Sequence, residues 1–439
     1  MKVLKFGGTS VGSATRMQGV VNLINDGETK VVVLSAMSGT TNALIEFTNY
    51  LRNGNPTGAI EHITGLQSKY WQTIKDLYST ESYIAKATEK INEIYNHLRS
   101  LAQQPLTTDN EKEIVAQGEM MSTNMVALYM EEQGINVKLL NSLEFMRLKA
   151  NEEPDMEYLA EKLTPFIESR TDGKIYIAQG FICTNSEGRI DNLQRGGSDY
   201  TATLIGAALQ AKEIQIWTDI DGMHNNDPRI VEGTRPVRHL HFEESAELAY
   251  FGAKILHPTC ILPAKLANVP VRLLNTMDPK AEGTLINNNL TEPGTIKAIA
   301  AKDNITAIRI KSGRMLLAYG FLRKVFEIFE SYKTSIDMVC TSEVGVSVTI
   351  DNVSQLCNIT DELKKYGTVT VDTDMVIICV VGDLHSDNVG FETLACQALK
   401  EIPVRMISYG GSNHNISFLV HKEDKIRTMQ ALSDTLFSM

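Results

Sequence analysis

A lysine and two adjacent glycines follow the first predicted strand. The segment reads Lys5-Phe6-Gly7-Gly8-Thr9-Ser10, directly after Val3-Leu4. Adjacent glycines let backbone N–H groups approach an anion closely, a lysine supplies a compact positive charge, and a helix N-terminus favours negative charge. The segment therefore predicts an anion site at a strand-to-helix turn. The alternative is a tight turn beside a solvated lysine.

A second glycine pair also precedes a predicted helix. It lies in Gln194-Arg195-Gly196-Gly197-Ser198-Asp199-Tyr200-Thr201. Arginine can clamp a carboxylate with two hydrogen bonds, and an aspartate can orient a lysine or bind magnesium-bound water. The alternative is an N-capping turn in which Asp199 only complements the helix dipole, but this leaves the arginine–glycine–glycine cluster unexplained.

A third polar segment follows the predicted strand Ile214–Trp217. It reads Thr218-Asp219-Ile220-Asp221-Gly222 and continues to Asn226-Asp227-Pro228-Arg229. Parallel sheets place ligands at the C-terminal edge of their strands, so these acids could meet ribose hydroxyls or magnesium and Arg229 could meet phosphate. A long polar loop is the alternative for this segment.

Several other chemistries are excluded by spacing. Gly7 and Gly12 have the spacing of a Walker loop, but Ser13 stands where that motif needs lysine, and no two glycines are separated by one residue. His239 and His241 have no acidic or cysteine partners at metal-ligand spacing, so we expect no metal bound directly by side chains. No Ser/His/Asp or Cys/His order indicates acyl transfer.

The candidate residues of the three segments fit phosphoryl transfer to a small acid. This reaction needs positioning and charge neutralisation more than covalent catalysis. A carboxylate acceptor is already ionised at neutral pH and needs no general base. Gly118-Glu119 lies inside the predicted helix Glu111–Tyr129, where glycine costs about 1 kcal/mol relative to alanine. Either a ligand or a closely packed helix would explain that glycine.

Alternation of strands and helices up to about residue 285 predicts a mostly parallel sheet covered on both faces. Helical spacing is clear in Ala202–Leu209 and Glu243–Leu256, and Ala59–Leu101 reads as a helical hairpin laid against the sheet. The predicted strands are Val3–Phe6, Val31–Leu34, Val137–Leu140, Ile175–Ile177, Ile214–Trp217 and Val271–Leu274.

A boundary is predicted at Asn287-Asn288-Asn289, after which the elements become shorter. Two stretches then repeat weakly at a period of about 70 residues, with helices starting at Gly320-Phe321 and Gly390-Phe391. Strands are expected at Ile336–Val339 and Val346–Ile350, and at Val404–Ile407 and Ile416–Val420. Each unit reads as a ferredoxin-like βαββαβ module, which is more typical of a regulatory region than of a second catalytic core.

Composition and net charge limit the partners and the location that we expect for the protein. The 439 residues carry a net charge of −11 with no basic domain, which argues against a nucleic-acid partner. No run of 18 apolar residues predicts a membrane span, so we expect a cytoplasmic protein with no membrane partner. None of the six cysteines is in a CxxC pair and five lie in apolar stretches, which predicts buried free thiols.

At these motifs the sequence resembles the aspartate kinases, members of the amino acid kinase superfamily. The resemblance covers nearly the whole chain. It rests on KFGGTS (Lys5–Ser10), LSAMSGTTN (Leu34–Asn42), GE (Gly118-Glu119), RGGSDYT (Arg195–Thr201), TDxxG with DPR (Thr218–Gly222, Asp227–Arg229) and ELAYFGAKILHP (Glu247–Pro258). The fold this implies is a three-layer αβα kinase domain with a mainly parallel sheet, followed by two α+β ACT modules.

The resemblance implies transfer of phosphate from ATP to the side-chain carboxylate of L-aspartate, with Mg²⁺ as a further cofactor. Lys5 would stabilise the transferring phosphoryl group, and Asp199 would orient this lysine or the magnesium shell. The implied substrate residues are Thr41, Glu119 for the ammonium, Arg195 for the α-carboxylate, Gly196, Gly197 and Ser198. The implied nucleotide residues are Lys5, Gly7, Gly8, Ser35, Thr218, Asp219, His224, Arg229 and Lys254.

The C-terminal region is most similar to the lysine-sensitive, monofunctional class. The residues implied to bind the lysine effector are Met315, Ala318, Phe321, Leu322, Ile336, Asp337, Ser342 and Glu343. Gln194, His224 and Ala318 depart from the family pattern, where glycine, tyrosine and serine are usual. The resemblance also implies a homodimer or a dimer of dimers formed through the ACT modules.

The expected domains are a kinase domain over residues 1–290, with a helical segment at about 57–104, and a regulatory region over 295–439. Within the latter, a module at about 315–385 is inserted into one formed by 299–314 and 386–439. Two alternatives stay open for function. One is a kinase for glutamate or an acylated amino acid; the other is a sensor that binds lysine without turnover.

Overall fold

The computed structural model describes residues 1–167, 173–193, 196–252, 256–290, 292–312, 319–385 and 387–437. The chain divides into two compact units. The first comprises Met1–Met223 with Leu256–Asn288, and the second His224–Ile255 with Asn289–Met439. Among the described residues, no helix is long and apolar enough to cross a membrane.

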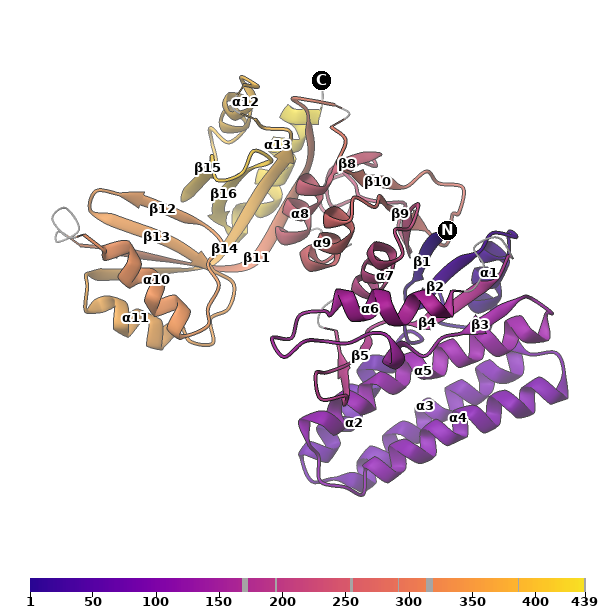
Figure 1. The fold of residues 1–439 in the computed structure, drawn as a ribbon. Coiled ribbons are helices and arrows are strands. Elements are labelled where there is room, and N and C mark those ends of the chain that lie inside the picture. Colours follow the sequence, from indigo (N-terminus) through magenta and orange to yellow (C-terminus); the bar gives the residue numbers. More distant parts are fainter. Residues whose placement is uncertain are drawn as a thin grey trace. The chain divides into compact units, whose positions relative to one another are not determined.

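A mainly parallel sheet forms the centre of the first unit (Figure 1). Its strands are β1 (Lys2–Phe6), β2 (Lys30–Leu34), β3 (Val137–Leu139), β4 (Ile175–Gln179), β7 (Ile214–Thr218), β9 (Val271–Asn275) and β10 (Thr284–Asn287). They are ordered β3-β4-β2-β1-β7-β9-β10, and only the pairing of β9 with β10 is antiparallel among them. All six predicted strands are confirmed. Every residue of β2 and β4 is buried, as expected for strands covered on both faces.

Helices cover this sheet. They are α1 (Ala14–Ile24), α2 (Thr40–Arg52), α3 (Pro56–Leu77), α4 (Glu81–Leu101), α5 (Thr108–Glu132), α6 (Met156–Leu163), α7 (Gly197–Ala208) and α9 (Pro258–Leu266). Short 3-10 turns lie at Ser142–Glu144 and Thr164–Phe166, and β5 (Ile182–Thr184) pairs with β6 (Ile190–Asn192). The unit is therefore of the layered α/β class that the alternating pattern predicts.

The predicted helical hairpin is confirmed as α3 and α4, which lie alongside α5 in Figure 1. Helix α3 begins with Pro56, whose fixed φ suits the first helical position, and the side chain of Asn55 accepts a hydrogen bond from the Gly58 N–H group. Both helices bury one apolar face in a continuous core, where the Tyr70 and Tyr95 rings meet edge to face at 6.3 Å.

Gly118 is explained by close packing of α5. A Cβ atom at this position would lie 2.8 Å from the Ala36 Cβ and 3.3 Å from the Thr40 Cγ2. Of the two explanations left open by the sequence, the packed helix therefore holds. The same close approach also places the next residue, Glu119, against the loop that follows β2.

The second unit contains an antiparallel sheet ordered β12-β13-β11-β14-β16-β15. Its strands are β11 (Ile296–Lys311), β12 (Val339–Ser342), β13 (Gly345–Ile350), β14 (Thr368–Gly382), β15 (Met406–Tyr409) and β16 (Asn415–His421). Its other elements are β8 (His239–His241), α8 (Phe242–Tyr250), α10 (Phe321–Ser331), α11 (Leu356–Lys364), α12 (Phe391–Ala398), a 3-10 turn (Lys422–Asp424) and α13 (Lys425–Phe437).

Strands β11 and β14 run through both halves of this sheet. Their register shifts around Ile305, and a separate apolar core lies on either side of that point. The half made by β11, α10, β12, β13, α11 and β14 follows the expected βαββαβ order. The two expected modules therefore share strands rather than follow one another along the chain.

Three local expectations are corrected. The strand expected at Ile336–Val339 begins only at Val339. The helix expected over Glu243–Leu256 ends at Tyr250, because Gly252 has a φ of +114° and a Cβ there would lie 2.2 Å from the Ala301 carbonyl oxygen. All six cysteines are free thiols, but only Cys183, Cys260 and Cys379 are buried. Cys340 is half-buried, and Cys357 and Cys396 are exposed on the outer sides of amphipathic helices.

Two glycine-to-alanine variants test the packing of α5. Gly118→Ala should lower the free energy of unfolding, because the added methyl group would overlap the Ala36 side chain. Gly65→Ala is the matched control, since Gly65 lies inside α3 with no atom within 4 Å of its Cβ position, and it should raise stability by about 1 kcal/mol. Urea unfolding of both variants measures this. Equal shifts in the two variants would contradict the packing explanation.

Candidate active site

The register of the parallel sheet brings the motif segments to one edge. Phe6 pairs with Leu34 on one side and with Trp217 on the other, and Leu34 pairs with Gln179. The residues that follow these strands therefore emerge together at the C-terminal edge. The loops are also joined directly, because the Ser35 N–H group donates to the Phe6 carbonyl and the Ser38 N–H group to the Gly8 carbonyl, both at 3.1 Å.

Lys5 and Asp199 form an ion pair at this edge. The Nζ of Lys5 lies 2.7 Å from the Oδ1 of Asp199, and both side chains are largely buried. The contact does not have hydrogen-bond geometry, so Asp199 Oδ1 has no hydrogen-bond partner among the described residues. Asp199 therefore does more than complement the dipole of α7, and Lys5 is held by a partner rather than solvated.

Glu119 is a buried carboxylate beside the loop after β2. Its Oε1 accepts a hydrogen bond from the Ala36 N–H group at 3.1 Å, while its Oε2 has no partner among the described residues. Burial raises the pKa of Glu119 to about 8, and the Ala36 hydrogen bond only partly counters this. A charge held in this place without a counter-ion is costly, which favours a cationic ligand group.

The start of α7 supplies backbone N–H groups. Gly196 has a φ of +75° and precedes the helix, whose N-terminus carries no side-chain cap. Added Cβ atoms would lie 2.6 Å from the Cys260 Sγ at Gly196 and 2.4 Å from the Phe181 Cδ2 at Gly197. The glycine pair is therefore required by close packing, and the uncapped N–H groups suit an anion. Gln194 and Arg195 lie outside the described residues.

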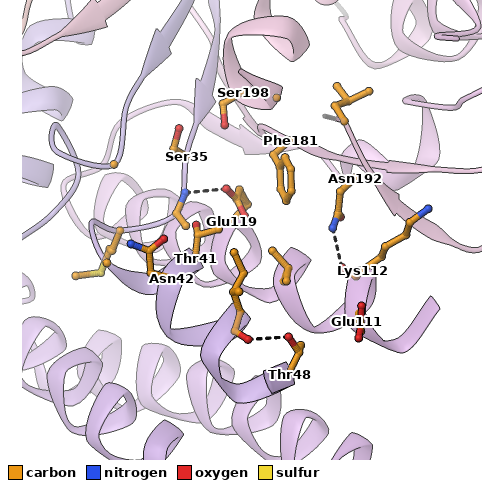
Figure 2. Close-up of a pocket in the computed structure, with 18 of the residues that line it drawn as sticks. Ser35, Thr41, Asn42, Thr48, Glu111, Lys112, Glu119, Phe181, Asn192 and Ser198 are labelled. Atoms are coloured by element: carbon orange, nitrogen blue, oxygen red, sulfur yellow. Dashed lines mark hydrogen bonds between the residues drawn. The ribbon is translucent and has the colours of Figure 1, made fainter. Parts of the chain in front are cut away.

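These groups surround one cavity of about 850 Å³ (Figure 2). Seven residues that the sequence singled out line it, namely Gly8, Ser35, Thr41, Glu119, Gly196, Gly197 and Ser198. Lys5 and Asp199 lie next to it, since the Gly7 Cβ position is 3.5 Å from Lys5 Nζ and Asp199 follows Ser198.

Other lining residues were missed. Phe181, Asn42, Lys112 and Asn192 also line the cavity, as Figure 2 shows. Phe181 follows β4 and has a φ of +70°, an uncommon conformation for a residue other than glycine. The only signal for Phe181 in the sequence is its place after a predicted strand, while Lys112 and Asn192 come from segments without a motif.

The predicted nucleotide residues are only partly brought together. Thr218 and Asp219 lie at the end of β7, next to β1, with Asp219 exposed. His224, which is 3.0 Å from the Thr234 hydroxyl, and Arg229, which pairs with Asp227, belong to the second unit. Lys254 lies outside the described residues. Their nucleotide contacts stay predictions.

The predicted effector residues lie in the second unit. Phe321 is buried at the start of α10, Leu322, Ser342 and Glu343 are exposed, and Ile336 is half-buried. Met315 and Ala318 lie outside the described residues.

Asp337 is the most constrained of the predicted effector residues. Its side chain is 1% exposed, its Oδ1 accepts a hydrogen bond from the Tyr250 hydroxyl at 2.7 Å, and Lys302 Nζ lies 2.6 Å away. The Oδ2 atom has no partner among the described residues. A buried carboxylate with one free oxygen is thus present in this unit as well.

Known proteins are similar to this chain over nearly its whole length. A model of the amino acid kinase family matches residues 1–275, and a model of the ACT domain matches residues 378–436. The chain is 33% identical to the lysine-sensitive aspartokinase 3 of Escherichia coli (strain K12), over 99% of both proteins. It is 35% identical to the chloroplastic aspartokinase 1 of Arabidopsis thaliana, over 99% of this chain and 80% of that protein.

Solved structures show the same similarity. The crystal structure of Escherichia coli aspartokinase III in complex with aspartate and ADP matches with a TM-score of 0.84 and 32% identity, covering 100% of both chains. The complex of that enzyme with lysine and aspartate matches with a TM-score of 0.82 and 33% identity, covering 100% of this chain and 99% of the other.

Glu119 should make stability depend on pH. The folded chain holds a proton on this carboxyl up to about pH 8, whereas the ordinary pKa is 4.5. Stability should therefore fall as pH rises between these values, by at most about 1.4 kcal/mol per pH unit, and level off above them. Glutamine cannot ionise but can keep the Ala36 hydrogen bond, so the advantage of Glu119→Gln over the wild type should grow across this range.

Urea unfolding at a series of pH values measures this difference. Glu46→Gln is the matched control, because Glu46 is exposed and its replacement should leave the pH profile unchanged. If the unfolding free energies of Glu119→Gln and the wild type changed with pH in parallel, the raised pKa of Glu119 would be contradicted.

Proposed function

The chain belongs to the amino acid kinase family, and from this premise we propose that it is an aspartate kinase. The reaction transfers the γ-phosphoryl group of ATP to the side-chain carboxylate of L-aspartate and yields 4-phospho-L-aspartate and ADP. The observation that carries the proposal is the Glu119 carboxylate, buried in the cavity wall with one unpaired oxygen.

A carboxylate in this wall favours a free amino acid over other anions. Both substrates of the proposed reaction are anionic, so an acidic group beside them would be repulsive unless it met a cation. The ammonium of free aspartate supplies that cation and would lower the raised pKa of Glu119. An acylated amino acid has no ammonium, so Glu119 would either stay protonated or carry a charge without a partner.

The other end of the substrate is negatively charged. Backbone N–H groups of Gly196, Gly197 and Ser198 and the hydroxyl of Thr41 are the groups that would position its carboxylates. Arg195 is proposed as the partner of the α-carboxylate on the strength of the motif.

Lys5 neutralises the charge that moves during transfer. Its ammonium is placed by Asp199 beside Gly7 and Gly8, where the family's phosphate-binding turn follows β1. Because the acceptor is an ionised carboxylate, no group has to remove a proton, and positioning with charge neutralisation accounts for the catalysis.

Magnesium fits as a cofactor carried mainly by the nucleotide. Mg²⁺ usually takes one or two carboxylates, water and substrate phosphates. The Asp199 carboxylate is paired with Lys5 but has further lone pairs that could accept a hydrogen bond from a bound water. The described residues contain no group of three or more histidines, cysteines, aspartates and glutamates that could hold a metal ion. When bound, the ion would neutralise charge on the phosphates.

For the second unit we propose the regulatory role. The bounds we retain are residues 1–290 for the kinase domain and 295–439 for the ACT region, in which a module at about 315–385 is inserted into the other. The continuity of β11 and β14 through both halves of the sheet supports this insertion. The regulatory region would bind lysine and join copies of the chain into a homodimer or a dimer of dimers.

The central experiment is steady-state turnover with ATP and aspartate, and with glutamate as the competing acceptor, detected as the acyl hydroxamate. We expect activity with aspartate. Lys5→Ala should lower kcat by at least about 100-fold, because it removes the cation that faces the phosphoryl group. Lys2→Ala, a change of the half-buried lysine three residues earlier that pairs with Glu28, should leave kcat unchanged.

Three outcomes would count against parts of this proposal. Activity with glutamate alone would point to another amino acid kinase. Undiminished turnover in Lys5→Ala would remove the assigned role of Lys5. A wild-type chain that binds lysine without any turnover would support the sensor instead.

The effector site can be tested at Asp337. Its free Oδ2 would accept a hydrogen bond from the ammonium of lysine, so Asp337→Asn should raise the lysine concentration for half-inhibition at least about tenfold. Asp351→Asn is the matched control, because Asp351 is also close to Lys302, at 3.0 Å, but its side chain is 44% exposed. Inhibition curves for both variants measure this, with threonine tried in parallel. Equal shifts would contradict the assignment.

A further inference from the structure

The loop of residues 35–41 forms one wall of the cavity. This 35–41 loop comprises the residues after β2 and the first two residues of α2. All five residues from Ser35 to Gly39 line the cavity, as does Thr41. Its first half is held by groups of the site, since the Ala36 N–H group donates to Glu119, the Ser38 N–H group donates to Gly8, and the Ser122 hydroxyl donates to the Ser35 carbonyl at 2.8 Å.

The second half of the 35–41 loop is contacted from the helical hairpin. The hydroxyls of Tyr70 and Thr40 lie 3.0 Å apart, within hydrogen-bond distance, and the Lys69 ammonium donates to the Ser38 carbonyl at 2.8 Å. Both side chains come from adjacent residues of α3. The hairpin is thus joined by hydrogen bonds to the loop that carries Thr41, a proposed substrate residue.

The Tyr70 contact is well defined. Tyr70 is fully buried, and burial raises the pKa of its hydroxyl, so that it keeps its proton. Thr40 is the first residue of α2, which follows Gly39 with a φ of +83° and no side-chain cap. The entry to α2 is therefore held by other contacts than a side-chain cap. The Thr40 N–H group donates to the Met37 carbonyl at 2.9 Å, and the Tyr70–Thr40 hydrogen bond and the packing of Gly118 add to it.

Tyr95 provides an internal comparison. It is also fully buried, it lies on α4, and its ring packs against that of Tyr70, yet its hydroxyl has no hydrogen-bond partner among the described residues. The two tyrosines thus share burial and packing. They differ in that only Tyr70 is joined to the 35–41 loop.

We propose that the α3–α4 hairpin positions the aspartate-binding wall of the cavity, with Tyr70 as a positioning residue that acts through Thr40. This rests on the proposed function, since it assigns Thr41 and Glu119 to the substrate. It gives a role to the helical hairpin, whose residues otherwise lie outside the cavity and whose amphipathic pattern alone indicates only packing.

The test compares Tyr70→Phe with Tyr95→Phe. Each variant removes one buried hydroxyl and keeps the ring. Tyr70→Phe should raise the KM for aspartate about three- to tenfold, with kcat and the KM for ATP changed less than about twofold, because one neutral hydrogen bond to the aspartate wall is lost. Tyr95→Phe should leave all three constants unchanged. The thermal midpoint of each variant shows whether the fold is equally affected.

A second variant keeps the test decisive if Tyr70→Phe does not fold. Thr40→Val removes the other partner and should raise the KM for aspartate in the same way. In the double variant the KM should be no higher than in the worse single variant, since both changes break one contact.

Three results would overturn the positioning role. They are equal KM values for Tyr70→Phe and Tyr95→Phe, an unchanged KM in Thr40→Val, and single effects that multiply in the double variant. A wild-type chain without turnover on aspartate and ATP would instead contradict the proposed function.

Discussion

The desolvation of Glu119 is the constraint around which the first unit is organised. A carboxylate taken out of water is costly unless it is hydrogen-bonded or paired, and only one oxygen of Glu119 has a hydrogen-bond partner among the described residues. The burial follows from Gly118, whose missing side chain lets α5 approach the loop after β2. The oxygen of Glu119 without a hydrogen-bond partner among the described residues is the basis for proposing a ligand that is anionic and also carries a cationic group.

The groups of the site that suit anionic ligands act over short distances. The chain is acidic overall, with a net charge of −11, so long-range attraction does not bring in two anionic substrates. The groups that we propose to receive them lie at one sheet edge and are the Lys5 ammonium, held by Asp199, and the uncapped N–H groups at the start of α7. The N–H groups of α7 follow Gly196, whose positive φ glycine adopts without strain.

The second unit also contains a buried carboxylate, Asp337, with one oxygen that has no partner among the described residues. Asp337 is held by Tyr250 at the end of α8 and by Lys302 in β11, two elements that are distant from it in the sequence. Lys302 belongs to β11, which pairs with β14 through both halves of the sheet, so Asp337 contacts a strand that both modules share. This arrangement is suited to coupling, since shared strands cannot move in one module without the other.

Much of the architecture was accessible from the amino-acid order. Unbroken apolar runs predicted the six parallel strands, helical spacing predicted the α3–α4 hairpin, and glycine pairs ahead of predicted helices marked the segments at Gly7 and Gly196. These features depend on residues a few positions apart, whose burial and backbone preferences are local. The motifs likewise indicated Lys5 and Glu119.

Contacts between distant segments depended on the folded chain. The choice between a ligand and a packed helix at Gly118, the place of Phe181 and Asn192 in the cavity wall, the Tyr70–Thr40 hydrogen bond and the partners of Asp337 all join residues far apart in the sequence. Strand register and helix packing bring these together, and neither is encoded in a short window of sequence. The residue types of the site could therefore be read in the chain, whereas the groups that hold them in place became visible only in three dimensions.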